Sequence, residues 1–242
     1  MGGCGRSGEV TAPAPTSPVI ETPMTGVYVG AGENGMVELT ISTAPAAPET
    51  TVTAFGTLSR DGGGTANLAG TYDTATDSLH LSGSGYTLAG LYLAGAAPPR
   101  LSGSFSGSLG SGFFVALVGA RSSVRSFCAT YENSGATLWG TIDLTVSSSS
   151  VAGFEVLDGD TFVVALAGSV SGTGTTRTVA FAGNPFVGSG TWNTSTRHVE
   201  GTWTADAQSG VWSGDECLAG TTSQNSPRAR SRASRGRASG GL

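Results

Sequence analysis

The sequence predicts an all-β protein whose strands form an antiparallel meander. Between Met24 and Cys217 apolar residues alternate with polar ones in short runs, and none shows the period of an amphipathic helix. Glycine supplies 39 of the 242 residues and charged residues only 12%, which is typical of short strands joined by turns. The connections are too short for crossover helices, so neighbouring strands are expected to pair antiparallel.

Individual strands are recognised by their alternation. Val37, Leu39 and Ile41 are separated by Glu38 and Thr40. Successive side chains of a strand point to opposite faces, so the three apolar side chains would face a core. The same pattern occurs at Leu79–Leu81, Leu101–Phe105 and Val199–Trp203, and turn-like connectors occur at Arg60–Gly63, Gly95–Pro99 and Asn193–Thr196.

The body of the chain is an internal duplication. The run LSGSFSGSLGSGFF, which starts at Leu101, lines up with VEGTWTADAQSGVW, which starts at Val199. Likewise GMVELTIS from Gly35 matches GTIDLTVS from Gly140. Further matches in the same order are Thr25–Tyr28 with Cys128–Tyr131, Leu68–Gly70 with Leu166–Gly168, and Gly83, Tyr86, Gly90 and Tyr92 with Gly183, Phe186, Gly190 and Trp192. Ordered matches of this kind predict two homologous modules.

The duplication and the composition of the ends divide the chain. Module 1 is expected at residues 25–119 and module 2 at residues 127–217, joined by a linker at 120–126. Each would hold seven or eight short strands in a closed barrel or sandwich. Residues 1–24 are expected to be a disordered tether and residues 218–242, with five arginines, a disordered Arg-rich tail. The body has no basic patch with interleaved aromatics, so no nucleic-acid partner is expected.

Two of the three cysteines bound module 2. Cys128 falls in its first strand and Cys217 just after its last. In a closed module the first and last strands are neighbours, so a Cys128–Cys217 disulfide would clamp the closure. Module 1 has Thr25 and Gly119 at the corresponding places, so both partners are missing together. The alternative is two buried free thiols; a disulfide would indicate export to an oxidising compartment.

Cys4 is predicted to be a lipidation site. Gly2-Gly3-Cys4 is similar to the end of a bacterial lipobox, whose cysteine becomes the lipidated N-terminus, and a Pro-rich stretch follows it. Only three residues precede Cys4, too few for the apolar segment of a signal peptide, so either translation starts further upstream or Cys4 is an ordinary thiol. We therefore expect an exported protein, extracellular or lipid-anchored at the outer-membrane surface of the cell envelope, with no transmembrane helix.

Two runs carry a family resemblance. LAGTYDTATDSLHLSGSGYTLAGLY from Leu68 and LSGSFSGSLGSGFF resemble Gly-rich β modules of predicted secreted proteins and lipoproteins of myxobacteria. The CATY opening at Cys128 and the GVWSGDEC ending at Cys217 are similar to the bounds of one such module. The resemblance implies an envelope location and no catalytic residue. The Gly-Thr-Trp runs at Gly190 and Gly201 more weakly resemble avidin-type barrels, without a recognisable biotin-site pattern.

The sequence offers little material for metal binding or catalysis. His80 and His198 have no second ligand residue at metal-binding spacing. Asp73, Asp77 and the segment Asp158–Asp160 lack the EF-hand spacing and are expected in β-turns. No G-x-S-x-G elbow is present between a strand and a helix. We therefore expect no metal, no cofactor and no catalytic residue.

One carboxylate pair would suit a glycan hydrolase. Asp215 and Glu216 are adjacent and lie close to Trp212. Adjacent residues of a strand point to opposite faces, whereas the two carboxylates of a glycosidase flank one bond. The pair is therefore expected at a solvated strand end, and the protein is not expected to be an enzyme.

Aromatic residues of module 2 are the remaining candidates for binding. Phe186, Trp192 and Trp203 would line a ligand pocket if the module were hollow, and the two tryptophans, on adjacent strands, are expected to pair across them. Aromatic residues recur at the matching places of module 1, which favours core packing.

The sequence thus favours a non-enzymatic envelope lipoprotein or secreted β protein with a structural or adhesive surface role. The alternative is a small-ligand-binding barrel of lipocalin or avidin type, and a glycan hydrolase comes third. A filled interior would favour the first hypothesis, and a pocket lined by the three aromatic residues would favour the second.

Overall fold

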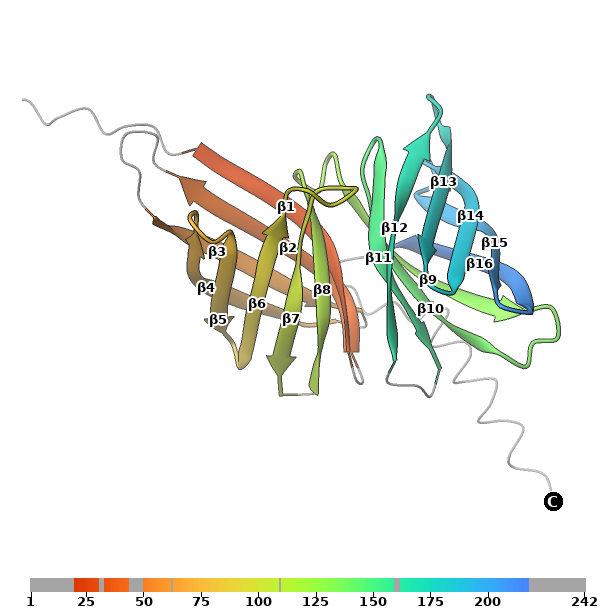
Figure 1. The fold of residues 1–242 in the computed structure, drawn as a ribbon, viewed down its shortest axis with the longest axis horizontal. Coiled ribbons are helices and arrows are strands. Elements are labelled where there is room, and N and C mark those ends of the chain that lie inside the picture. The colour runs from red at the N-terminus through yellow and green to blue at the C-terminus, as the bar shows by residue number, and fades with distance from the viewer. Residues whose placement is uncertain are drawn as a thin grey trace, which may run out of the picture.

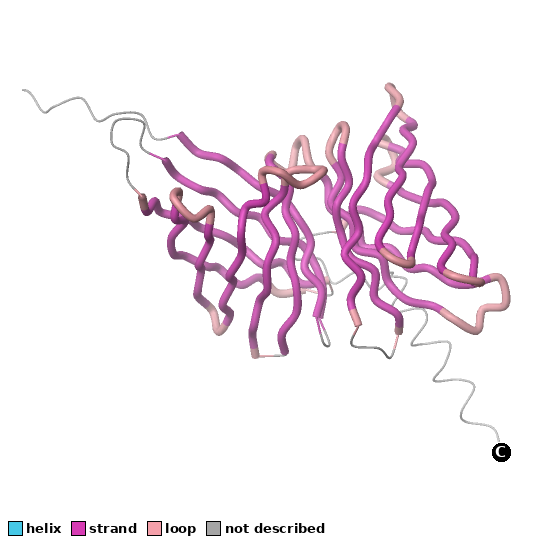
Figure 2. Tube along the Cα trace, in the orientation of Figure 1, coloured by secondary structure: helices cyan, strands magenta, loops and turns pink. Residues whose placement is uncertain are grey.

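The chain folds into two closed β-barrels in tandem. The structure, a computed structural model, describes residues 20–30, 33–43, 50–61, 63–108, 110–158 and 162–217. Within these residues it contains strands and turns and no helix. The two barrels lie side by side (Figures 1 and 2). The predicted fold class, an antiparallel meander in two tandem modules, is confirmed, and each module is a barrel rather than a sandwich.

Barrel 1 contains the first eight strands of the described residues. They are β1 Ile20–Gly30, β2 Glu33–Thr43, β3 Thr51–Arg60, β4 Thr65–Asp73, β5 Ser78–Gly83, β6 Tyr86–Leu93, β7 Arg100–Gly107 and β8 Gly110–Val118. Each strand pairs antiparallel with the next, and β8 returns to pair with β1.

Barrel 2 repeats this arrangement. Its strands are β9 Arg125–Asn133, β10 Trp139–Val146, β11 Ser150–Leu157, β12 Val163–Ser171, β13 Thr176–Gly183, β14 Phe186–Asn193, β15 His198–Ala205 and β16 Gln208–Glu216. The last strand, β16, pairs antiparallel with β9 and closes the barrel.

Alternation along each strand separates a packed interior from a solvent-exposed outer face. In β3, for example, Val52 and Ala54 are buried while Thr51 and Thr53 are exposed. Eight strands enclose an interior that side chains can fill. The largest fully buried side chains of the interiors are Met24, Tyr28, Leu58, Leu79, Leu88, Leu101, Phe105 and Phe114 in barrel 1 and Phe127, Ile142 and Trp212 in barrel 2.

The strand register confirms the duplication. Tyr28 lies opposite Gly35 on one side and Phe114 on the other. Tyr131 lies in the same way opposite Gly140 and Trp212. The sequence match therefore describes equivalent positions in space, so the barrels can be compared residue by residue.

Facing glycines make room for one large ring in each barrel. Gly90 lies directly opposite Gly103, and a Cβ on Gly90 would lie 2.7 Å from Cζ of Phe114. In barrel 2 the equivalent glycines also face each other, and the indole Nε1 of Trp212 donates to the neighbouring carbonyl oxygens of Ser189 at 3.3 Å and Thr202 at 3.2 Å. A Cβ on Gly103, Gly190 or Gly201 would lie 2.0, 2.0 or 2.1 Å from a carbonyl oxygen of the facing strand, so the close approach of the two strands also requires glycine there.

Both barrels begin earlier than the sequence predicted. β1 starts at Ile20, inside the expected tether, and β9 starts at Arg125, inside the expected linker. Met24 is only 2% exposed in the core of barrel 1, and the carbonyl oxygen of Pro23 accepts a hydrogen bond from the amide of Gly119 at 2.8 Å. The start of β1 contains proline and threonine and has only a weak apolar pattern, so the sequence did not indicate a strand there. Pairing with β2 and β8 outweighs that weak pattern.

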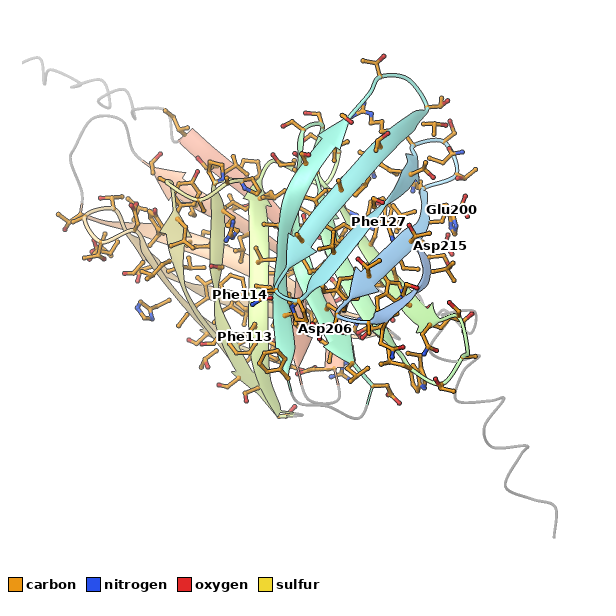
Figure 3. The ribbon with its side chains drawn as sticks, turned by 45° about the vertical axis from the view of Figure 1, so that its right-hand side comes forward. Phe113, Phe114, Phe127, Glu200, Asp206 and Asp215 are labelled. Carbon is orange, nitrogen blue, oxygen red and sulfur yellow. A yellow bond between two sulfur atoms is a disulfide. The ribbon has the colours of Figure 1, made fainter. Side chains whose placement is uncertain are left out.

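A small apolar interface joins the barrels. Outward-facing side chains of β1 and β8 pack against β11 and the connection between the barrels, and the buried members of this cluster are Val27, Val29, Val115, Leu117, Val124, Ala152 and Phe154. Phe113 lies at the same seam (Figure 3), with its ring centroid 6.5 Å from that of Phe154. The barrels therefore share a second core outside their interiors.

Hydrogen bonds also cross this interface. The hydroxyl groups of Ser126 and Thr145 donate to the carbonyl oxygens of Gly26 and Thr25, at 2.8 and 3.0 Å. The side-chain amide of Asn34 donates to Oδ2 of Asp143 at 2.8 Å, and Asp143 is only 1% exposed. Directional bonds between buried groups fix how one barrel sits on the other.

Candidate functional site

The predicted disulfide is present and closes barrel 2. Cys128 lies in β9, and Cys217 follows directly after β16. Their Cα atoms are 5.2 Å apart and their sulfur atoms are bonded. The amide of Cys217 donates to the carbonyl oxygen of Ser126 at 2.8 Å, which extends the pairing of the two strands by one residue. The alternative of two free thiols is therefore wrong. Cys4, the predicted lipidation site, lies outside the described residues.

Barrel 1 has a hydrogen bond where barrel 2 has the disulfide. The hydroxyl of Thr25 donates to the carbonyl oxygen of Gly119 at 2.9 Å. Gly119 has a φ of 139°, and a Cβ on it would lie 2.6 Å from Cγ2 of Val124. A cysteine at this place would thus collide with the residue that leads into the second barrel. The two closures are equivalent in position and different in chemistry.

Two of the predicted pocket residues fill the interior of barrel 2. The rings of Phe186 and Trp203 are stacked with centroids 5.2 Å apart, and Tyr131 meets both edge-on at 5.3 and 5.0 Å. All three side chains are at most 4% exposed. Rings at these separations are in contact. At this end the side chains therefore pack against one another and do not line an open pocket.

Trp192, the third predicted pocket residue, lies elsewhere. It pairs with Val199, whereas Trp203 pairs with Gly188 near the other end of the same two strands. The expectation that the tryptophans pair across adjacent strands is thus wrong, because the short turn sets a register that separates them. Trp192 instead meets Phe127 edge-on at 5.8 Å, and the guanidinium of Arg177 lies 5.2 Å from its ring centroid.

Buried tyrosine–carboxylate pairs are features that the sequence analysis missed. The hydroxyl of Tyr131 donates to Glu155, and in barrel 1 that of Tyr86 donates to Glu33 at 3.0 Å. Burial, with the hydrogen bond to Glu155, raises the pKa of Tyr131. Burial, with the nearby Glu33, raises that of Tyr28. A lone glutamate at an inward position of an apolar run, as in Phe154-Glu155-Val156, is the signal that could have revealed Glu155.

Glu216 is buried among arginines, so its predicted place at a solvated strand end is wrong. Its side chain is 3% exposed and its Oε1 accepts from Nη1 of Arg125 at 3.0 Å. Arg121 and Arg197 approach its carboxylate to 3.8 and 3.5 Å. Asp215, in contrast, has a side chain that is 74% exposed, as expected. The pair points to opposite faces of β16, which separates the two carboxylates of the hydrolase hypothesis.

The two histidines lie on outer faces. His198 Nδ1 is 2.8 Å from Asp215 and its Nε2 3.8 Å from Glu200, and Glu200 and Asp215 lie together on one side of barrel 2 (Figure 3). His80 is exposed on β5. Among the residues that the structure describes, no group of three or more His, Cys, Asp or Glu is placed to hold a metal ion.

The aspartates proposed for turns have structural partners. Oδ1 of Asp73 accepts from the amides of Ala75 and Thr76 at 2.8 and 3.1 Å, which is an Asx turn. Asp77 accepts from the hydroxyl of Tyr72 at 2.7 Å. In the other segment, Asp160 lies outside the described residues.

Comparisons with known proteins identify no family for this chain. No protein-family model and no curated protein matches the chain. Across the described ranges, no helix has the length and apolar character needed to cross a bilayer.

Proposed function

We propose that this protein is an exported, non-enzymatic β protein with a structural or adhesive role at the bacterial cell surface, held there through Cys4. The observation that carries the proposal is the packing of barrel 2. Phe186, Trp203 and Tyr131 contact one another in its interior. A filled interior suits a rigid module better than a carrier, which needs a cavity for its ligand.

The disulfide supports the exported part of the proposal. Bonds such as Cys128–Cys217 persist in oxidising compartments and are rare in the bacterial cytoplasm. The joint between the barrels supports the structural part, because it combines a buried apolar cluster with hydrogen bonds and so keeps two modules in one orientation. A stiff two-barrel body is suited to presenting its outer face at a distance from an anchor.

Localisation tests the proposal directly. The gene is expressed in its source bacterium with its native upstream region, and cells are fractionated into cytoplasm, membrane and medium. We expect the protein in the membrane fraction with Cys128 and Cys217 oxidised, and Cys4→Ser is expected to release it. Cytoplasmic protein with reduced cysteines would contradict export. Exported protein whose Cys4→Ser variant stays with the membrane would contradict the lipid anchor alone.

The alternative function, a small-ligand carrier, is tested by whether a ligand binds inside barrel 2. Purified protein is titrated with an apolar fluorescent dye and with biotin, and the intrinsic tryptophan emission is recorded. We expect no saturable response, because the rings of Phe186 and Trp203 occupy the space a ligand would need. Saturable binding that is lost in Trp203→Ala would contradict the structural role and support a ligand-binding function.

A further inference from the structure

The disulfide end of barrel 2 gathers most of the arginines of the described chain. Arg125 begins β9, Arg177 lies near the start of β13, Arg197 directly precedes β15, and Arg121 lies just before the barrel. Together they are called the arginine rim. Strand starts and ends alternate around a meander barrel, so these positions all belong to one end of barrel 2. The carboxylate of Glu216, at the end of β16, lies among them.

The rim carries more positive charge than Glu216 neutralises. Three guanidinium groups lie within 4.0 Å of its single carboxylate, at 3.0, 3.5 and 3.8 Å. One guanidinium already balances the charge of a single carboxylate, and each further arginine adds repulsion among like charges. The side chain of Arg197 is 59% exposed and that of Glu216 3% exposed. The excess charge is thus open to solvent above a buried carboxylate.

Two buried polar atoms at this end have no hydrogen-bond partner among the described residues. They are Nε of Arg177, a donor, and Oε2 of Glu216, an acceptor. Cζ of Arg177 lies over the ring of Trp192, 5.2 Å from its centroid, in a cation–π contact. A buried donor without an acceptor is costly, and an added oxyanion would remove that cost.

The equivalent end of barrel 1 carries one arginine, Arg100 at the start of β7, and no cluster of arginines among the described residues. Arg177 lies opposite Trp192. The matching place beside Tyr92 is held by Asp77, whose carbonyl oxygen accepts from the amide of Tyr92 and whose carboxylate accepts from the hydroxyl of Tyr72. Glu216 is matched by Val118, which is 49% exposed. A barrel of this design therefore closes without an arginine cluster, so closure alone does not explain the rim.

The other charged groups near the rim face outward. Asp215 and Glu200 flank His198 on the outer surface of barrel 2, with side chains 74% and 67% exposed. They alternate along their strands with the inward-facing Glu216 and Val199. Asp206 belongs to the opposite end of the barrel (Figure 3). Inside the rim, Glu216 is thus the carboxylate that the described residues supply.

We infer that the arginine rim binds a phosphate group, either free phosphate or the phosphate of a phospholipid headgroup. The guanidinium fork matches phosphate oxygens with two parallel hydrogen bonds, and several arginines can share one phosphate. The unpartnered Nε of Arg177 and the exposed guanidinium of Arg197 supply N–H donors for the oxygens of such a group. This inference does not depend on the proposed role at the cell surface.

Calorimetric titration of the full chain with inorganic phosphate at low ionic strength tests the free source. Loss of one charge-assisted contact in Arg177→Gln or Arg197→Gln is expected to weaken binding about 10-fold. Arg100→Gln removes the same charge from barrel 1, where Arg100 contacts the carbonyl oxygen of Pro98, and is expected to bind like the wild type. Circular dichroism checks that each variant is folded. The side chain of Arg197 is 59% exposed, so its replacement is expected to leave the fold intact.

Vesicle sedimentation tests the lipid source. Phosphatidylcholine vesicles with and without phosphatidylglycerol are compared. Rim-dependent binding to either kind of vesicle assigns the site to a headgroup phosphate, and binding that needs phosphatidylglycerol shows that the headgroup must also carry a net negative charge. Glu216→Gln, which removes the rim's own anion, is expected to raise the affinity for whichever source binds. The inference is overturned if neither phosphate nor vesicles bind, if Arg100→Gln loses as much as the rim variants, or if Glu216→Gln leaves the affinity unchanged or lower.

Discussion

Barrel 1 and barrel 2 pair their first and last strands in the same register, but they secure that pairing differently. Thr25 donates a 2.9 Å hydrogen bond to Gly119 where Cys128 is bonded to Cys217. In the loop-entropy view a cross-link acts mainly by restricting the unfolded chain, whereas a hydrogen bond acts in the folded state. The comparison teaches that two barrels of the same shape can owe their stability to different states of the chain.

The interiors of the two barrels differ in the size of their buried aromatic rings. At equivalent positions Phe105 and Phe114 in barrel 1 are replaced by Trp203 and Trp212 in barrel 2. Barrel 1 has the edge-on pair of Tyr28 and Phe105, at 5.1 Å, within a largely aliphatic core. The backbone register thus accommodates different ring sizes, so it is set by strand pairing and glycine positions and not by one particular set of side chains.

The largest effect is expected from emptying these interiors. Trp203 and Phe105 are each 2% exposed, so Trp203→Ala and Phe105→Ala should each lower the free energy of unfolding by about 3–5 kcal/mol. Val211→Ala, at a side chain that is 54% exposed, serves as the control and should change it by less than about 0.5 kcal/mol. Urea denaturation measures all three. A loss near the control value at Trp203 would show that its ring does not fill the barrel.

The closures are compared by removing each in turn. Cys128→Ser and Cys217→Ser should each cost about 2–5 kcal/mol, and the double variant should be no worse than either single one. Thr25→Val in barrel 1 removes only a hydrogen bond and should cost about 0.5–1.5 kcal/mol. Chemical denaturation under non-reducing conditions gives the values. Additive losses for the two cysteines would contradict the disulfide.

The joint between the barrels can be broken at Asn34. Asn34→Ala takes a donor from Asp143, which is 1% exposed, and should cost about 1–3 kcal/mol. Calorimetry of the wild type should show one unfolding transition for both barrels, and the variant should broaden or split it. Asn67→Ala, an exposed position of β4, is the matched control. Two separate transitions already present in the wild type would mean that the barrels do not support each other.

High pH should give the smallest effect, absent near neutrality. Burial raises the pKa of Tyr28 and Tyr131 above the value of about 10 that an unfolded chain has. The neutral hydroxyl is therefore favoured by folding, and its contribution is complete below that pH and lost as the pH rises toward the folded pKa. Tyr131→Phe should make the alkaline fall in stability shallower, as measured by unfolding and by tyrosinate absorbance. An unchanged alkaline limb would show that Tyr131 titrates normally.

Much of this architecture could be predicted because it rests on local signals. Alternation, as at Val37, Leu39 and Ile41, identifies strands, and the order of matching segments identifies the duplication. The cysteines could be paired because both counterparts are missing in module 1. The position of Trp192 relative to Trp203 could not, because it depends on the register of a hairpin whose turn, around Asn193–Thr196, can be closed in more than one way.

By itself, the sequence determined the meander, the two modules and the pairing of Cys128 with Cys217, since these follow from periodicity and from comparison of the two halves. The tertiary structure decided which charged groups meet. Glu216, Arg125 and Arg197 come from different strand ends, and Asn34 and Asp143 come from different barrels. Such meetings depend on how the sheet curves closed and on which outer faces the barrels bury against each other. No local sequence pattern encodes that geometry, because the residues at one strand end do not show which other strand ends lie beside them in the closed barrel.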